Sequence, residues 1–124
     1  MHKINLASKL AQVAEHWSPR IVAELNGQHV ELVKFAGEFV WHQHECEDEL
    51  FLVLEGSFVM EYREHGQQQS IQLNPGEFLV VPRGIEHRPV AAAEVSVLLF
   101  EPCTTKNTGD LADSPLTVDA PAWL

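Results

Sequence analysis

The sequence has few basic residues and no long apolar run. It contains 8 Lys and Arg residues against 18 Asp and Glu residues, which gives a formal net charge of -10 at pH 7. A chain with this charge gains little from contacts with phosphates, so we expect it to bind neither nucleic acid nor an anionic membrane surface. No stretch approaches the length of a membrane-spanning helix, and the first residues lack the apolar segment of a secretory signal. These absences predict a cytoplasmic protein.

Cysteine is also scarce. Cys46 and Cys103 are the only two, and they lie in unrelated segments. This placement argues against the disulfide framework of a small secreted domain, so we expect both thiols to be free. Cys46 follows His44 by two residues, which leaves two interpretations open: a thiol that approaches a metal bound nearby, or an ordinary exposed loop residue.

Short β-rich runs separated by turn residues make up most of the chain. The Asn26-Gly27 pair between two such runs is a strong hairpin signal. About eight or nine short strands at this spacing predict an all-β antiparallel sandwich or barrel. The predicted strands cover residues 20–25, 28–35, 40–44, 49–55, 57–63, 67–73, 78–81, 87–91 and 95–101.

A short helix is expected before the strands. Leu6, Leu10 and Val13 recur at helical spacing after Asn5, a candidate N-cap, and this pattern predicts a helix over residues 6–16. At 124 residues the chain fits one domain. We expect three segments: an N-terminal helical cap at 1–20, the barrel at 21–101, and a C-terminal tail at 102–124 that packs on the barrel or on a partner subunit.

Side chains with metal-ligand chemistry gather in one stretch of the sequence. Residues two apart on a strand share a face, so His42 and His44 would aim both imidazoles into one cavity. Glu49 opens a strand on which it shares an inward face with Phe51 and Val53. An ionised carboxylate in that apolar interior is costly unless it is paired or coordinates a cation. The pattern therefore predicts a metal site.

A fourth candidate ligand, His87, comes from a later block. Pro82 and Gly84 predict a rigid turn that would bring His87 to the same cavity. Three imidazoles and one carboxylate suit a transition metal better than calcium or magnesium. On an octahedral ion, four protein ligands leave two positions for a substrate, water or dioxygen. We therefore predict one divalent Fe, Mn, Ni, Zn, Co or Cu ion per chain and leave its identity open.

These two blocks together resemble the two sequence motifs of the cupin superfamily. The first block reads GEFVWHQHECEDELFLVLEG over residues 37–56, and the second reads GEFLVVPRGIEH over residues 76–87. The spacings match, with one departure: Ala91 stands where the family often has an Asn that is not a metal ligand. The resemblance implies a double-stranded β-helix, the jelly-roll cupin barrel, with a short N-terminal helix in this chain. It also implies the ligand set His42, His44, Glu49 and His87.

The resemblance leaves the activity open. Small single-domain cupins with a similar sequence pattern are often labelled mannose-6-phosphate isomerase-like. The resemblance implies a metal-binding protein that holds a small organic molecule. If the protein is an enzyme, a metal-dependent dioxygenase and an isomerase or lyase compete, with sugar-phosphate isomerisation as a lesser alternative. The other class is a non-catalytic cupin module that binds or senses a metabolite or a metal. The sequence identifies no catalytic residue beyond the ligands.

Several predicted strands are apolar on both faces, as residues 50–54 and 95–100 illustrate. One face fills the barrel, and the other must also be hidden from water. A partner subunit is the simplest cover, so we expect a homodimer. The alternative is that the N-terminal helix and the tail, with Trp17 and Trp123, cover this face within one chain.

Overall fold

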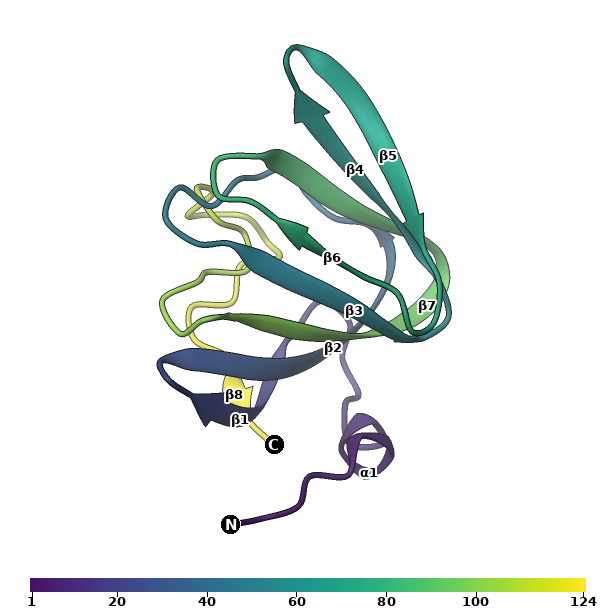
Figure 1. Cartoon of the computed structure of the whole chain (residues 1–124), viewed down its shortest axis with the longest axis vertical. Coiled ribbons are helices and arrows are strands. Elements are labelled where there is room, and N and C mark those ends of the chain that lie inside the picture. Colours follow the sequence, from purple (N-terminus) through teal and green to yellow (C-terminus); the bar gives the residue numbers. More distant parts are fainter.

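The chain is almost entirely β-structure, as the strand pattern predicted. A computed structural model describes residues 1–124, with one short helix ahead of eight strands (Figure 1). The elements are α1 (Leu6–Leu10), β1 (Arg20–Leu25), β2 (Gln28–Glu38), β3 (Glu49–Glu55), β4 (Phe58–Glu64), β5 (Gln67–Leu73), β6 (Phe78–Val81), β7 (Glu86–Pro102) and β8 (Ala122–Trp123). No helix has both the length and the apolar character needed to cross a membrane.

The long strands β2 and β7 form the spine of the sheet. They pair antiparallel along the whole of β2. The other edge of β7 carries two strands in succession, β4 on its first residues and β3 on its later ones. Strands β5 and β6 add to the outer sides of β4 and β3, while β1 and then β8 extend the sheet beyond β2. Because β7 pairs with different partners along its length, the sheet curls around an interior (Figure 1).

Alternate residues of the strands fill this interior. On β3, Phe51 and Val53 are buried on the same side as Glu49, which is the alternation expected from the sequence. On β7, Val95 and Val97 are fully buried in the same way. These apolar residues belong to one cluster of twelve buried side chains. Since each buried methylene contributes about 0.8 kcal/mol, this cluster is the main stabilising feature of the barrel.

The N-terminal helix is shorter than the predicted range of 6–16. Asn5 does cap it, because its side chain accepts a hydrogen bond from a backbone N–H three residues later at 2.9 Å, but the helix ends at Leu10. A helix this short gains its stability from packing rather than from its own hydrogen bonds. The chain turns after it so that Leu10 and Val13 pack on the outer face of β1 and β2. A positive φ of 60° at Trp17 then redirects the chain toward β1.

This N-terminal segment covers part of the second apolar face of the sheet. Leu54 of β3 and Leu98 of β7 pack against the cluster that Leu10 and Val13 form with β1 and β2. On β6, by contrast, Phe78 and Val80 are 61% and 49% exposed. The chain therefore covers some of this face by itself and leaves the side chains of β6 open to solvent. The homodimer stays a prediction.

Two strand predictions differ from the structure. Residues 40–44 do not form a strand, and only an isolated bridge between His42 and His87 is present there. The segments predicted as separate strands at 87–91 and 95–101 belong to one strand, β7. The pairing of β2 with β7 shifts register between Phe35 and Gly37, and the two strands stay paired on both sides of this shift.

Gly56 allows a close crossing between the β3–β4 turn and β7. Its φ is +81°, and a Cβ at this position would lie 2.8 Å from the backbone oxygen of Glu94 and 3.2 Å from the Cα of Val95. Gly66, at the β4–β5 hairpin, has a similar φ of +74° but nothing within 4 Å of a Cβ. The two glycines therefore share a backbone conformation and differ in their surroundings.

We expect Gly56→Ala to lower the free energy of unfolding by about 3 kcal/mol and Gly66→Ala to lower it by about 1 kcal/mol. Both changes place an L side chain in the left-handed region, but only the first also forces the methyl group against backbone. Chemical denaturation of the two variants measures the difference. Equal losses would show that the close approach at Gly56 carries no energetic weight.

Candidate metal centre

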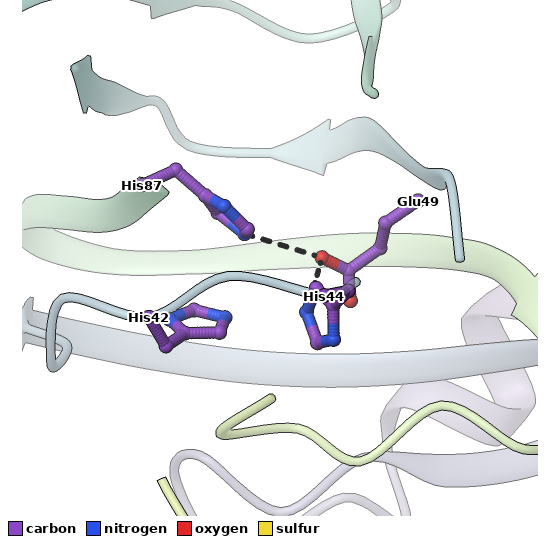
Figure 2. A group of neighbouring side chains, drawn as sticks. All are labelled: His42, His44, Glu49 and His87. Atoms are coloured by element: carbon purple, nitrogen blue, oxygen red, sulfur yellow. Dashed lines mark ion pairs between the residues drawn. The ribbon is translucent and has the colours of Figure 1, made fainter. Parts of the chain in front are cut away.

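Four side chains from three parts of the chain converge inside the barrel (Figure 2). His42 and His44 lie in the loop after β2, Glu49 begins β3, and His87 lies near the start of β7. None is more than 4% exposed, and one ligand atom from each lies within 4.8 Å of all the others. The structure thus brings together all four residues that the sequence singled out.

Backbone pairing places His42 opposite His87. The N–H of His42 donates to the carbonyl of His87 at 3.1 Å, and the N–H of His87 donates to the carbonyl of His42 at 2.8 Å. The ring centroids are 4.3 Å apart. The predicted strand at 40–44 was expected to aim the imidazoles into the cavity. The isolated bridge to His87 does this for His42, because it fixes the backbone that carries this ring.

The backbone beside His44 is held by two other segments. Gly84, in the predicted turn, donates its N–H to the carbonyl of His44 at 2.7 Å. The neighbouring Gln43 exchanges hydrogen bonds with Asp110 of the C-terminal tail, each of 3.0 Å. Gly109 packs so closely that a Cβ there would lie 2.2 Å from the Gln43 oxygen. The tail is therefore part of the framework that sets the loop.

Two of the three imidazoles are oriented by carbonyl groups two residues upstream. Nδ1 of His42 lies 2.9 Å from the oxygen of Val40, and Nδ1 of His87 lies 2.8 Å from the oxygen of Ile85. Because a carbonyl only accepts, both Nδ1 atoms carry a proton, and in the neutral form of such a ring Nε2 is the atom with the free lone pair. His44 has no such partner at Nδ1.

The electrostatic surroundings of two of these histidines differ. Burial lowers the pKa of His42 to about 4, and the nearby His87 adds to this effect. Burial also lowers the pKa of His44, but the contact with the Glu49 carboxylate, helped by the charge of Glu47, outweighs it and the pKa is raised overall. At neutral pH His42 is therefore a neutral imidazole with an available lone pair.

A second buried carboxyl group, that of Glu101, contacts Glu49. Burial and the charge of Glu49 raise the pKa of Glu101 well above its usual range. Burial acts to raise the pKa of Glu49 as well, but its contacts with Glu101, His44 and His87 hold it well below its usual range. Glu101 is thus the protonated partner of an ionised Glu49. Glu31, only 1% exposed, contacts Glu101 in turn.

Glu101 and Glu31 were not among the site residues predicted from the sequence. The signal that could have found them is strand alternation, because Glu101 continues the inward-facing row that includes Leu99, and Glu31 precedes the inward-facing Val33 and Phe35. An acidic residue at an inward position of a predicted strand is a candidate buried polar group.

The atoms at the centre of the cluster fit a divalent cation. Glu49 Oε1 lies 3.3 Å from His44 Nε2 and 3.4 Å from His87 Nε2, which is longer than the N–H···O distance of about 2.9 Å in a well-formed hydrogen bond. None of these three buried atoms has a hydrogen-bond partner. Neighbouring ligands on an octahedral ion with bonds of about 2.1 Å stand about 3 Å apart. The spacing and the missing partners both point to a metal between them.

Two openings of different character lead to the cluster. A cavity with mostly aromatic and aliphatic walls reaches His42 and Glu49. A polar groove reaches His44 from the side of the loops, and Cys46 is one of its lining residues. Both cysteines are free and exposed, as expected, and Cys46 is not among the clustered ligand groups.

Comparison with known proteins places the chain among proteins of one fold. Residues 28–101 match the family model described as a cupin domain. A solved cupin-2 domain protein from Shewanella frigidimarina is 43% identical, with a TM-score of 0.75 over 80% of this chain and 93% of that chain. The uncharacterized protein YdbB from Bacillus subtilis is 33% identical over 84 residues, which are 68% of this chain and 72% of YdbB.

Some of the similar proteins have an activity in their names. Acireductone dioxygenase from Rhodopseudomonas palustris is 34% identical over 62 residues. These residues are 48% of this chain and 37% of that enzyme. The similarity therefore covers little more than a third of the dioxygenase.

We expect metal affinity to fall as the pH is lowered through the raised pKa of His44, because a protonated imidazole has no lone pair for a metal. Each proton that competes with the metal for a ligand contributes up to about tenfold per pH unit to this loss, and His42, with a pKa of about 4, contributes none over this range. Titrations with zinc between pH 8 and pH 5 measure this dependence.

Glu47→Gln should lower the pH at which the zinc affinity begins to fall, because the charge of Glu47 helps to raise the pKa of His44. Glu45→Gln is the matched control, since Glu45 is an exposed neighbour that does not contribute to that pKa. A zinc affinity of the wild-type protein that begins to fall only below pH 6.5, the ordinary pKa of His, would contradict the raised pKa of His44.

Proposed function

Since the chain belongs to the cupin family, we propose that it binds one divalent transition metal and holds a small organic molecule at the open positions of that metal. The ligands are His42, His44, Glu49 and His87. The observation that carries the proposal is the set of buried, unpartnered nitrogen and oxygen atoms that face one another across about 3.3 Å. Burying them without a cation would cost several kcal/mol of desolvation, on the order of 2 to 7 kcal/mol for each polar group.

The ligand chemistry reduces the number of candidate metals but does not select one of them. Three imidazoles and one carboxylate suit Fe, Mn, Ni, Zn, Co or Cu better than Ca or Mg. The carboxylate matches a 2+ ion and the imidazoles bind in the neutral form, which the lowered pKa of His42 favours. The metal, when bound, would supply Lewis-acid or redox chemistry.

The protein's own groups would prepare this site in three ways. The carbonyls of Val40 and Ile85 hold the rings of His42 and His87 with Nε2 inward. The contact with the carboxyl group of Glu101 would keep the Glu49 carboxylate ionised. Apolar walls on one side keep bulk water away, which strengthens the electrostatic contacts inside.

A metal-dependent dioxygenase is the reaction class that we favour. It is supported by the similarity to acireductone dioxygenase, although that similarity spans only part of the enzyme. An isomerase or lyase would use the same open positions to polarise a carbonyl group. The alternative from another class is a binding or sensing cupin that holds its ligand without turnover. A homodimer and a cytoplasmic location also stay predictions.

Protein purified without added metal should carry close to one transition-metal ion per chain by elemental analysis. His42→Ala and His44→Ala should each weaken binding by at least about a hundredfold, because each removes a ligand from a small preformed set. His65→Ala is the matched control, since its side chain is 88% exposed and lies outside the cluster. Circular dichroism checks that the fold is intact.

A wild-type protein that is free of metal and refuses iron, manganese, nickel, cobalt, copper and zinc would refute the metal site. Persistent tight binding in the two His→Ala variants would refute the ligand set. Oxygen consumption by the iron-loaded protein with catechols, thiols or diketones would then separate a dioxygenase from an isomerase or a binding module.

A further inference from the structure

We propose that the polar groove beside His44 is the route by which the metal ion reaches the cluster and leaves it, and that Cys46, Glu47 and Asp110 capture the ion in this groove. The proposal rests on the metal-binding function above. It adds a loading function for three side chains that are not ligands of the cluster itself.

The apolar cavity is a poor entry for a metal ion. A divalent ion arrives with a shell of water molecules, and losing them is costly unless other ligands replace them. The cavity has a volume of about 40 Å³, which is room for about three water molecules at the ~10 to 15 Å³ that each one needs. Its aromatic walls are well packed, since Trp17 stacks on Phe35 with ring centroids 4.5 Å apart. A hydrated ion therefore does not fit this opening.

The groove that reaches His44 is larger and more polar. Its volume is about 370 Å³. The carboxylates of Glu45, Glu47 and Asp110 line it against the single positive charge of Lys106. A concave surface with an excess of one charge concentrates ions of the opposite sign. The groove therefore raises the local concentration of divalent cations beside the cluster.

His44 connects the groove with the cluster. It is the only one of the four clustered residues that lines the groove, although it is just 4% exposed. Its Nε2 lies 3.3 Å from Oε1 of Glu49, and its Nδ1 is buried without a hydrogen-bond partner. The two nitrogens of an imidazole point in nearly opposite directions, and either can bind a metal. His44 is thus the ligand that an ion in the groove meets first.

The ring of His44 is also the least constrained of the three imidazoles. Carbonyl oxygens lie 2.9 Å from Nδ1 of His42 and 2.8 Å from Nδ1 of His87, whereas Nδ1 of His44 has no such contact. Because no hydrogen bond has to break, this ring turns at a lower cost than the other two. This freedom lets His44 pass an ion from the groove to the cluster.

The thiol of Cys46 gives the groove a preference among cations. Cys46 is free and exposed, lines the groove and lies two residues after His44. Sulfur is a soft ligand that binds transition metals in preference to calcium or magnesium. A few side chains on an open surface hold an ion only weakly, and weak binding lets the ion move on to the buried ligands.

Two carboxylates stand close to the ring of His44. Oδ1 of Asp110 accepts a hydrogen bond from the N–H of Gln43 at 3.0 Å, which fixes Asp110 beside the loop that carries the ligand. Burial lowers the pKa of His44 and the contact with Glu49 raises it, and the charges of Glu47 and Asp110 raise it further. Both charges therefore act at the ring itself and draw a cation toward it.

The two cysteines supply a matched pair for the test. Cys103→Ser leaves Cys46 as the only thiol, and Cys46→Ser leaves Cys103, which is exposed but does not line the groove. Each variant is alkylated with N-ethylmaleimide. Cobalt uptake is then followed by stopped-flow absorbance, and cobalt release by adding an excess of chelator.

Alkylation should slow both uptake and release at least about tenfold in Cys103→Ser and should change neither rate in Cys46→Ser. The Kd for cobalt should stay the same in both variants, because a blocked route slows the two directions equally. Damage to the ligand set would instead raise the Kd.

Charge variants test the capture step at pH 8 and 0.1 M salt. Glu47→Gln should slow cobalt uptake by about threefold and Lys106→Gln should speed it by a similar factor, because they change the field of the groove in opposite directions. Glu55→Gln is the matched control. Glu55 ends β3 six residues after Glu49, about 20 Å along the strand, which exceeds the Debye length of about 10 Å. At 1 M salt the effects of both groove variants should disappear.

Equal rates before and after alkylation of Cys46 would overturn the route. Charge variants that change uptake in the same direction, or whose effects persist at 1 M salt, would overturn the capture role of the groove. A wild-type protein that binds no cobalt would instead refute the metal-binding function on which this proposal rests.

Discussion

An ionised carboxylate in an apolar barrel is the constraint on which the rest of this structure depends. Glu49 shares the inward face of β3 with Phe51 and Val53, so its charge cannot reach bulk water. Such a charge persists only where other groups compensate it. Three imidazoles and the carboxyl of Glu101 surround it, and a divalent cation between the imidazoles would complete the compensation. The fold keeps this costly arrangement, which is typical of a functional site.

The site is assembled from segments that the barrel alone does not specify. The strands supply Glu49 and His87, but His42 and His44 lie in a loop whose path is fixed by hydrogen bonds from the turn at Gly84 and from the tail at Asp110. The N-terminal segment adds Trp17 to the lining of the apolar cavity. The terminal segments are therefore part of the site, and not merely covers for the sheet.

The two openings that lead to the cluster differ in polarity. The groove at His44 is polar and has three acidic side chains against one lysine, so it favours water and cations. The cavity at His42 has mostly apolar walls, so it favours the apolar part of an organic molecule. A metal between them would have a hydrated side and a dry side. This asymmetry would let one ion hold water or dioxygen and an organic ligand in separate surroundings.

The sequence alone determined the all-β class, most strand positions and the four residues of the cluster, because period-two alternation, turn residues and ligand spacing are local signals. It did not determine how His42 reaches the cluster, since the predicted strand at 40–44 is an isolated bridge to His87. Nor did it reveal the contact of Glu101 with Glu49 or the place of Trp17 beside Phe35. These depend on strand pairing between residues far apart in the chain, and only the folded sheet sets that register.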